Sequence, residues 1–245
     1  MEILGVRIDN LSKKEILQTV EGFLKEDKFH QIATVNPEFI LKAQSDLEFK
    51  HILNSCALNV ADGVGLWYAH IRFFKWLRCR MTGVELMHEV LNLADEKALK
   101  VFIAINQNGL SSLDEIKQAL EIKYPRIKLS GAELIFDEQI SDIEEYRAKA
   151  LENEIVLCNF GAPMQEKFLN LAKNDTIRLA MGVGGAFDFL TKKRSRAPKI
   201  VQKLGLEWLW RIFSQGLGEK VFFISRLKRI FKAVVVFPLR IIINK

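Results

Sequence analysis

Leu58-Asn59-Val60-Ala61-Asp62-Gly63-Val64-Gly65 is the stretch that decides the fold class of this chain. An apolar run ends in an acid, two glycines follow, and a helix-like stretch starts at Leu66. In an open α/β sheet, a buried strand delivers a carboxylate to a ligand site in this way, because glycines let the backbone turn sharply and a ligand approach closely. The alternative is that Asp62 only caps the following helix.

The same unit, an apolar run followed by a helical pattern, recurs along the chain. Most of the runs lack polar alternation, which is typical of strands buried on both faces of a parallel sheet. The expected strands are Ile3–Ile8, Gln31–Val35, Ala57–Ala61, Lys100–Ile105, Ile127–Leu129, Ile155–Asn159 and Ile177–Val183. The expected helices are Pro37–Leu53, Gly83–Lys97, Ser111–Lys123, Ile140–Glu152, Pro163–Ala172 and Pro198–Phe213, with a further helix capped by Ser12 and Glu15. This alternation predicts an α/β fold with a Rossmann-like, doubly wound, mostly parallel sheet and helices on both faces.

Composition is that of a folded globular protein. The 245 residues are 49% hydrophobic and 27% charged, which excludes a disordered chain and suffices for one large domain or one domain with an appendage. The three cysteines have no CxxC spacing, which argues against a zinc site or a disulfide framework and fits a reducing, cytoplasmic location. Residues 1–5 have neither the basic nor the apolar region of a secretory signal.

Charge is distributed unevenly along the chain. The net charge is +6, but residues 192–245 carry 14 basic and two acidic side chains, a balance of +12. The remaining 191 residues carry 22 basic and 28 acidic side chains, a balance of −6. We therefore expect an α/β body over residues 1–195 and a basic appendage over residues 196–245, with an anionic partner for the appendage.

The appendage interleaves basic residues with large apolar ones. No stretch reaches about 18 uncharged apolar residues, and Lys232, Pro238 and Arg240 interrupt the best one, so a membrane-spanning helix is not expected. A basic amphipathic helix lying in the membrane interface fits better. The alternatives are a helix packed on the body or on a partner subunit, as in a homo-oligomer, and a nucleic-acid patch. The aliphatic content exceeds what phosphate binding needs, so no nucleic acid is expected.

Residues at the predicted carboxyl ends of the strands are all polar or glycine. Ligands of doubly wound sheets bind beyond these ends. Two prolines, Pro37 and Pro163, can each open a helix there, and helix N-termini attract anions. This edge therefore suits a hydroxyl-rich ligand that carries phosphate, although strand ends are also polar simply because loops are solvated. The residues are Thr34, Asn36, Asp62, Gly63, Gly65, Asn106, Gln107, Gly131, Asn159, Gly161, Gln165, Gly182, Gly184 and Gly185.

Several common motifs are absent. The stretch Gly182-Val183-Gly184-Gly185 lacks the third glycine of a dinucleotide fingerprint, and there is no P-loop and no HExxH. No Asp-x-Asp pair exists to hold a divalent ion, so we expect no metal and no cofactor. A diphosphate would then be neutralised by Arg, Lys and backbone N–H groups. Arg80 could clamp a phosphate, or it could be an ordinary surface charge.

Seven short motifs occur in a fixed order along the chain. They are Thr34-Val35-Asn36-Pro37-Glu38, Ala61-Asp62-Gly63-Val64-Gly65, Arg80-Met81-Thr82-Gly83-Val84-Glu85-Leu86, Gly161-Ala162-Pro163-Met164-Gln165-Glu166, Gly182-Val183-Gly184-Gly185-Ala186-Phe187-Asp188, Arg196-Ala197-Pro198 and Leu206-Glu207-Trp208-Leu209-Trp210-Arg211. In order and spacing they resemble the WecG/TagA/CpsF glycosyltransferase family, and the similarity covers about Ile3 to Arg211.

The resemblance implies an inverting transfer of a sugar from a UDP-sugar, without a metal. In the TagA branch the sugar is N-acetylmannosamine, and the acceptor is the 4-hydroxyl of N-acetylglucosamine on undecaprenyl diphosphate. That is an early step in the synthesis of wall teichoic acid or a related surface polysaccharide. Other branches use N-acetylmannosaminuronic acid or other hexoses. The family also has a basic C-terminal appendage, which implies peripheral contact with the inner face of the membrane.

The resemblance also implies roles for individual residues. Asp62 matches the general base; Thr34, Asn36 and Gln165 match polar pocket positions that orient hydroxyls. The family's basic positions, which would bind the diphosphate, correspond to Arg80, Arg196 and Arg211. The turn formed by Gly182, Gly184 and Gly185 would let the nucleotide lie close to the backbone. Two departures are Met164, where the family often has Lys, and Lys192, where glycine is common. The rival hypotheses are a non-catalytic membrane or nucleic-acid adaptor and a different nucleotide enzyme on the same sheet.

Overall fold

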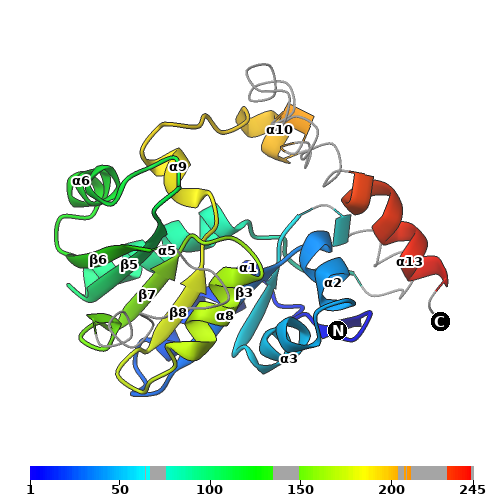
Figure 1. The fold of residues 1–245 in the computed structure, drawn as a ribbon, viewed down its shortest axis with the longest axis horizontal. Coiled ribbons are helices and arrows are strands. Elements are labelled where there is room, and N and C mark those ends of the chain that lie inside the picture. Colours follow the sequence, from blue (N-terminus) through cyan, green and yellow to red (C-terminus); the bar gives the residue numbers. More distant parts are fainter. Residues whose placement is uncertain are drawn as a thin grey trace.

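A six-stranded parallel sheet between two layers of helices forms the body of the protein (Figure 1). A computed structural model describes residues 1–63, 65–66, 76–134, 149–203, 207, 209–210 and 231–243. The strands of the sheet are β3 (His30–Val35), β4 (Leu58–Ala61), β5 (Lys100–Asn106), β6 (Lys128–Leu134), β7 (Ile155–Cys158) and β8 (Leu179–Gly182). Their order, β4-β3-β8-β7-β5-β6, with every neighbouring pair parallel, confirms the predicted α/β fold class.

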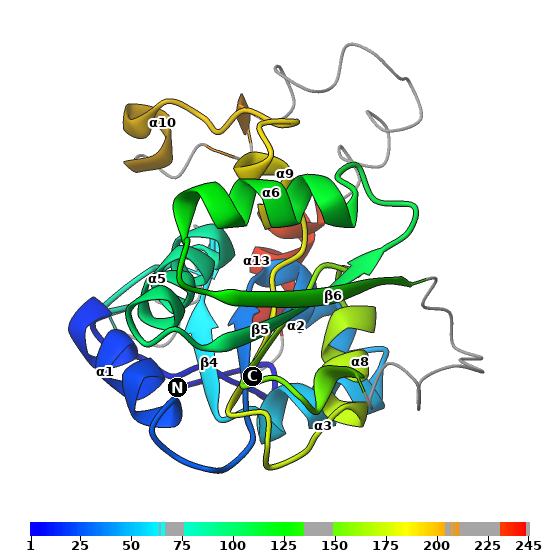
Figure 2. The same cartoon turned by 90° about the vertical axis from the view of Figure 1, so that its left-hand side faces the viewer.

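The helices divide between the two faces of this sheet (Figure 2). One apolar cluster joins the strands to α1 (Lys13–Phe23), α5 (Gly83–Glu96), α6 (Leu113–Lys123) and α9 (Ala186–Leu190). On the other face, two clusters join the strands to α2 (Pro37–Ala43), α3 (Leu47–Ser55), α8 (Met164–Leu171) and α13 (Phe237–Ile243). The other helices within the described ranges are α10 (Lys199–Lys203) and the π-helical η1 (Lys232–Val236).

Buried side chains of the strands divide between the two faces. In β3, Ile32 packs on the α1–α5 side and Ala33 on the α2–α3 side, and Ile103 and Ala104 of β5 likewise pack on opposite faces. The strands other than β6 are buried on both faces, which explains why their sequences are apolar without polar alternation.

Chain connections leave the strands in alternating directions. The helices after β3 and β7, α2 and α8, lie on one face, whereas the helices after β4, β5 and β8 lie on the other. A crevice opens at the carboxyl ends of parallel strands where neighbouring connections part in this way. The topology therefore places the candidate site at this edge, beneath α9 and α10 in Figure 1.

Two predicted elements are each divided into two in the structure. The expected strand Ile3–Ile8 is a hairpin of β1 (Glu2–Ile3) and β2 (Val6–Arg7), because Leu4 and Gly5 turn the chain with positive φ. The expected helix Pro37–Leu53 is two helices, α2 and α3, because the Asp46 side chain accepts a hydrogen bond from the Phe49 N–H and starts a new helix.

Gly131 was also misplaced, since the strand predicted over Ile127–Leu129 runs on to Leu134 as β6. Gly131 lies in its middle, opposite Ile103, and is not at a strand end. A Cβ there would lie 2.6 Å from the Ile103 carbonyl oxygen, so glycine is required by strand packing. Most of the helix expected over Ile140–Glu152 lies outside the described residues, as does much of the one expected over Pro198–Phe213.

The predicted capping box at Ser12 and Glu15 is confirmed, and two more start α5 and α6, at Thr82 with Glu85 and at Ser112 with Glu115.

Candidate active site at the carboxyl edge of the sheet

Asp62 follows β4 directly and lies at the N-terminus of α5. Its backbone N–H donates to the Val35 carbonyl oxygen at 2.8 Å, which fixes the residue against the end of β3. The Gly83 N–H, at the first position of α5, donates to the Asp62 Oδ2 at 3.4 Å. A negative charge is favoured at a helix N-terminus. The N-cap of α5 is Thr82. Most of the helix expected from Leu66 onward, which Asp62 was the alternative candidate to cap, lies outside the described residues.

Gly63 turns the chain away from this carboxylate with φ of +88°. Glycine was predicted to be needed after Asp62 because the backbone turns sharply there, and the positive φ of Gly63 confirms this. At Gly65 the need is different: a Cβ would overlap Pro37 and would lie 3.6 Å from the Ala233 carbonyl oxygen of η1. The loop that carries Asp62 is thus packed between α2 and the C-terminal segment.

Thr34 and Asn36 stand beside Asp62 at the end of β3. Thr34 is buried, and a Cβ on Gly83 would lie 3.2 Å from its Oγ1, so Thr34 packs directly against the start of α5. The Asn36 Oδ1 accepts hydrogen bonds from the Glu38 and Phe39 N–H groups, at 2.9 and 3.1 Å, as the N-cap of α2. The structure therefore brings Thr34, Asn36 and Asp62 together. It also shows that Asn36 caps α2, a role that the sequence did not predict.

Gln165 joins two glycine turns at the ends of β7 and β8. Its Oε1 accepts hydrogen bonds from the N–H groups of Gly161 and Gly184, each at 3.1 Å. Both glycines have positive φ, +77° and +49°. The side chain of Gln165 is buried, and Gly182 is close enough that a Cβ would overlap it. In this structure Gln165 binds the turns themselves, whereas the sequence pointed to contact with hydroxyl groups of a ligand.

Glu166 is a residue that the sequence analysis missed. It is 1% exposed, its Oε1 accepts a hydrogen bond from the Gln165 Nε2 at 2.7 Å, and its Oε2 has no partner among the described residues. Burial raises the pKa of this carboxyl to about 8. Its helical spacing was the available signal, since Gln165, Glu166, Phe168 and Leu169 form the buried side of α8.

Arg80 and Arg196 both contact the segment around α10. The Arg80 Nη2 donates to the Gln202 carbonyl oxygen at 2.9 Å. The Arg196 Nη2 lies 3.5 Å from the Glu207 Oε2, and the Arg196 Nε is buried with no hydrogen-bond partner within the described ranges. Arg211 lies outside the described residues. The two described arginines keep further donors for an anion, because a guanidinium carries five N–H groups.

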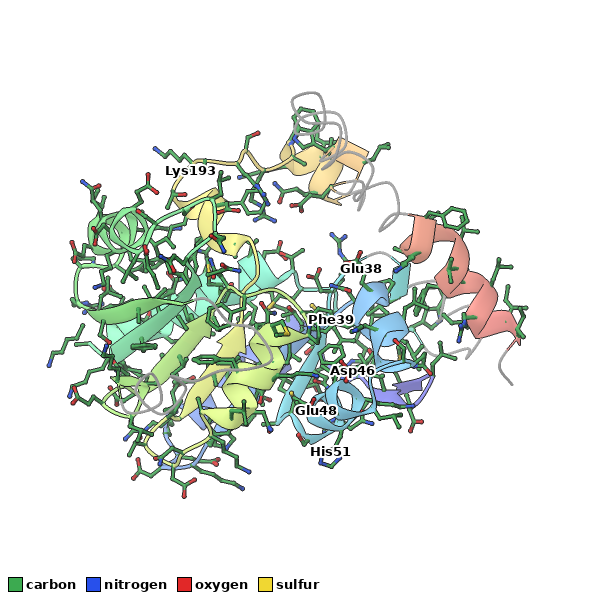
Figure 3. All side chains as sticks on the ribbon, in the orientation of Figure 1. Glu38, Phe39, Asp46, Glu48, His51 and Lys193 are labelled. Atoms are coloured by element: carbon green, nitrogen blue, oxygen red, sulfur yellow. The ribbon has the colours of Figure 1, made fainter. Side chains whose placement is uncertain are left out.

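Gly185 precedes α9 and lies next to a fixed arginine. The Arg194 Nη1 lies 3.3 Å from the Asp188 Oδ2, and the Ser111 hydroxyl donates to the other carboxylate oxygen of Asp188 at 3.0 Å. The neighbouring Lys193 turns to α6 and donates to the Leu110 carbonyl oxygen, on the side of the molecule away from Glu38 of α2 (Figure 3).

A surface hollow of about 840 Å³ between α1, α5 and the end of α6 is not part of this edge. Its charges neutralise one another, as in the Lys13–Glu89 pair at 3.0 Å and the Arg126–Asp95 pair at 3.3 Å. It therefore does not compete with the carboxyl edge as the site of a phosphate-bearing ligand.

The C-terminal segment returns to the body beside the Asp62 loop. Phe237 and Ile241 of α13 are buried in one cluster with Ile40 and Leu66. The same segment also exposes large apolar side chains, at Phe231 just before η1 and within η1 and α13: Phe231, Val234, Val235, Leu239, Ile242 and Ile243. In the described part of the chain, no helix combines the length and the apolar character needed to cross a bilayer.

The sequence model of the glycosyl transferase WecG/TagA/CpsF family matches residues 1–234. The chain belongs to this family. Among curated relatives, an N-acetylglucosaminyldiphosphoundecaprenol N-acetyl-beta-D-mannosaminyltransferase of Staphylococcus aureus strain NCTC 8325 is 28% identical over 214 residues, 86% of this chain and 83% of the relative. The protein of the same name from strain MRSA252 is 29% identical over 216 residues. Membership in the family makes the protein a glycosyltransferase.

One departure from the WecG/TagA/CpsF pattern has a visible structural meaning. Lys192, at a position where glycine is common in the family, adopts φ of +60° just after α9. The backbone there has the left-handed conformation that glycine adopts freely and other residues adopt at a cost.

Proposed function

We propose that this glycosyltransferase moves N-acetylmannosamine from a UDP-sugar to the 4-hydroxyl of N-acetylglucosamine on a polyprenyl diphosphate. The names of the Staphylococcus aureus relatives support this pair of substrates. The observation that carries the proposal is the position of Asp62, at the carboxyl edge of the sheet and against the first amide of α5. Teichoic acid or another surface polysaccharide would be the product pathway.

In the proposed mechanism Asp62 is the general base. The acceptor hydroxyl oxygen attacks the sugar C1, the bond between C1 and the phosphate oxygen breaks, and UDP leaves on the opposite face. Asp62 takes the hydroxyl proton as the new bond forms, which lowers the barrier because a neutral alcohol is a weak nucleophile. One carboxylate suffices for inversion. Thr34 and Asn36, which lie beside Asp62, would orient hydroxyl groups of the substrates.

In this proposal, basic residues neutralise the charge of the diphosphate. Arg80 and Arg196 lie along the segment near α10, and Arg211 follows shortly in the sequence. Charge-assisted hydrogen bonds from guanidinium groups suit phosphate oxygens. The Gly182–Gly185 turn would lie against the nucleotide. We expect transfer to proceed without a metal ion.

Contact with an anionic membrane surface is part of the same proposal. The exposed apolar side of η1 and α13 carries Lys232 and Arg240 in the same segment. This combination is typical of helices that lie in the interface of a bilayer. Because η1 packs on the Asp62 loop through Gly65, membrane contact would bring a lipid-linked acceptor close to the base.

The test is UDP release from a panel of UDP-sugars with a lipid-linked N-acetylglucosamine diphosphate acceptor, in the presence of EDTA. Release that depends on the acceptor and on UDP-N-acetylmannosamine is the expected result. Release with UDP-N-acetylmannosaminuronic acid or a UDP-hexose would assign a different donor. Release only after a metal is restored would contradict the metal-free mechanism. No release with any donor would favour a non-catalytic membrane adaptor.

A further inference from the structure

Gln165 and Glu166 form a buried polar pair beneath the candidate donor site. The Gln165 carboxamide is held at three points, since its oxygen accepts from the Gly161 and Gly184 amides and its nitrogen donates to the Glu166 Oε1. An amide can be oriented in two ways that differ by exchange of oxygen and nitrogen. Only the observed orientation serves both glycine amides, because these are donors.

Glu166 selects that orientation. Its Oε1 accepts from the Gln165 Nε2, and it remains an acceptor in the neutral acid when the proton is on Oε2, so it attracts the nitrogen end of the Gln165 amide. The Gln31 Nε2 donates to the Glu166 backbone carbonyl oxygen at 3.1 Å and ties this turn of α8 to β3. The four groups therefore connect β3, α8 and the turns after β7 and β8.

We propose that Glu166 is a positioning residue which, as a neutral carboxylic acid, locks Gln165 in place and thereby holds the Gly161 and Gly184 turns in register at the donor site. The proposal rests on the proposed function only in calling this edge the donor site. Glu166 does not touch substrate; it acts through Gln165.

Neutrality of Glu166 follows from its surroundings. The carboxyl is almost completely buried, and no described basic side chain is paired with it. The titratable groups that face it are Cys158 of β7 and Cys56 at the end of α3. Burial raises the pKa of both thiols, so neither adds a compensating charge. A carboxylate without a partner in such a place is costly, and the Glu166 Oε2 has none in the described part of the chain.

Ionisation of Glu166 should therefore favour opening of the pair. The pKa is about 8 in the closed structure, whereas a solvated carboxyl has the ordinary value of 4.5, so opening becomes easier as the pH rises between these two values. A buried carboxylate gains solvation when local opening lets water reach it. Opening the first turn of α8 would carry Gln165 away from the Gly161 and Gly184 amides, so both turns should lose their protection together.

The experiment measures amide hydrogen exchange of Gly161 and Gly184 by NMR, as a ratio to the rate of an unstructured chain, between about pH 6.5 and about pH 9. In the unmodified protein we expect protection of both amides to fall about tenfold per pH unit up to about pH 8 and to level off above it. Glu166→Gln keeps an acceptor for Gln165 and cannot ionise, so its protection should not change with pH. Glu166→Leu removes the acceptor, and both amides should lose protection at every pH.

The matched control is Glu48→Gln. Glu48 pairs with Lys167, the next residue on α8, but is exposed on α3 (Figure 3). This variant should keep the pH dependence of the unmodified protein. A pH-independent protection in the unmodified protein would overturn the proposal, as would full protection in Glu166→Leu. The unmodified protein alone gives a decisive result if a variant does not fold.

A separate measurement tests whether the Gln165–Glu166 pair affects the donor site. The KM for the donor should rise in Glu166→Leu, which lacks the acceptor for Gln165, and should stay that of the unmodified protein in Glu166→Gln. An unchanged KM in Glu166→Leu would separate the pair from the donor site and overturn the positioning role. Exchange needs no turnover, so an inactive protein with pH-dependent protection would refute the proposed function and leave the Gln165–Glu166 lock intact.

Discussion

Gly182 and Gln165 fit together because Gly182 has no side chain, since a Cβ at that position would overlap the Gln165 amide. Gly182→Ala should therefore push Gln165 away from Gly161 and Gly184. We expect the free energy of unfolding to fall by about 1–3 kcal/mol, as in other overpacked cores. Denaturant unfolding measures the change. Gly22→Ala in α1 is the matched control, because no atom of the described residues lies within 4 Å of a Cβ added there. It should stabilise the protein by about 0.5–1 kcal/mol. Equal effects of the two substitutions would contradict this packing argument.

Asp62→Asn should abolish the base while keeping the shape of the side chain. The carboxamide oxygen can still accept from the Gly83 N–H, so the fold should be unchanged by circular dichroism. We expect kcat to fall by about 10²–10⁴, the usual contribution of a general base. UDP release measures the effect, and Asp114→Asn on the exposed side of α6 is the control. Full activity of Asp62→Asn would exclude Asp62 as the base.

Glu166 should lower the free energy of unfolding as the pH rises, which is the opposite of the usual effect of an acidic side chain. Below about pH 4.5 the carboxyl is protonated in the folded and unfolded chains, and it contributes no difference. Between pH 4.5 and about 8 only the unfolded chain releases the proton, which favours unfolding. The free energy of unfolding should thus fall relative to Glu166→Gln by on the order of 1.4 kcal/mol per pH unit, and level off above pH 8. Thermal denaturation across this pH range measures the effect. If Glu166 were ionised in the folded protein, the stability of the unmodified protein and that of Glu166→Gln would change with pH in parallel.

Lys192→Gly should stabilise the protein slightly. Relief of the left-handed conformation at Lys192 is worth roughly 1–2 kcal/mol, and the greater freedom of glycine in the unfolded chain offsets roughly half of it. We expect a net gain of about 0.5 kcal/mol in the free energy of unfolding. Lys193→Gly is the control and should destabilise, because Lys193 binds the Leu110 carbonyl oxygen and Glu115. A loss of stability in Lys192→Gly would show that its side chain makes a contact worth more than the strain.

The double variant Leu239→Glu with Ile242→Glu should release the protein from anionic vesicles. These side chains are 51% and 65% exposed, whereas Phe237 and Ile241 hold the helix on the body and remain unchanged. Two added negative charges and the lost apolar area both oppose interfacial binding. Cosedimentation measures the bound fraction. Leu47→Glu on α3, where Leu47 is 77% exposed, is the control and should bind as before. Unchanged binding of the double variant would exclude α13 as the contact.

The layer fold and the Asp62 loop were predictable because both depend on local patterns. Apolar runs with glycine after them predict buried parallel strands, and the Ser12–Glu15 box marks a helix start without any knowledge of the fold. The hairpin around Leu4 and Gly5 was missed because its strands are only two residues long. The break at Asp46 had a usable signal, an Asp before an apolar run, that the continuing helical pattern concealed.

The clustering of the candidate site residues was predictable, but their hydrogen bonds were not. Thr34, Asn36 and Asp62 meet because parallel strands bring their ends to one edge. Nothing local in the sequence tells that the Gln165 oxygen is taken by two glycine amides, since Gly161 and Gly184 are brought together by β7 and β8. The burial of Glu166 is likewise a tertiary fact, which its spacing on α8 hints at and only the packed sheet establishes.

The packing of Phe237 against Leu66 has a consequence for the newly made chain. During synthesis, Leu66 and Ile40 leave the ribosome long before Phe237 and Ile241, the residues that cover them. At about 5–20 residues per second, the intervening chain takes on the order of ten seconds or more to appear. The apolar surface next to Asp62 is exposed throughout that interval, so premature termination should yield a sticky, aggregation-prone product rather than a merely shortened enzyme.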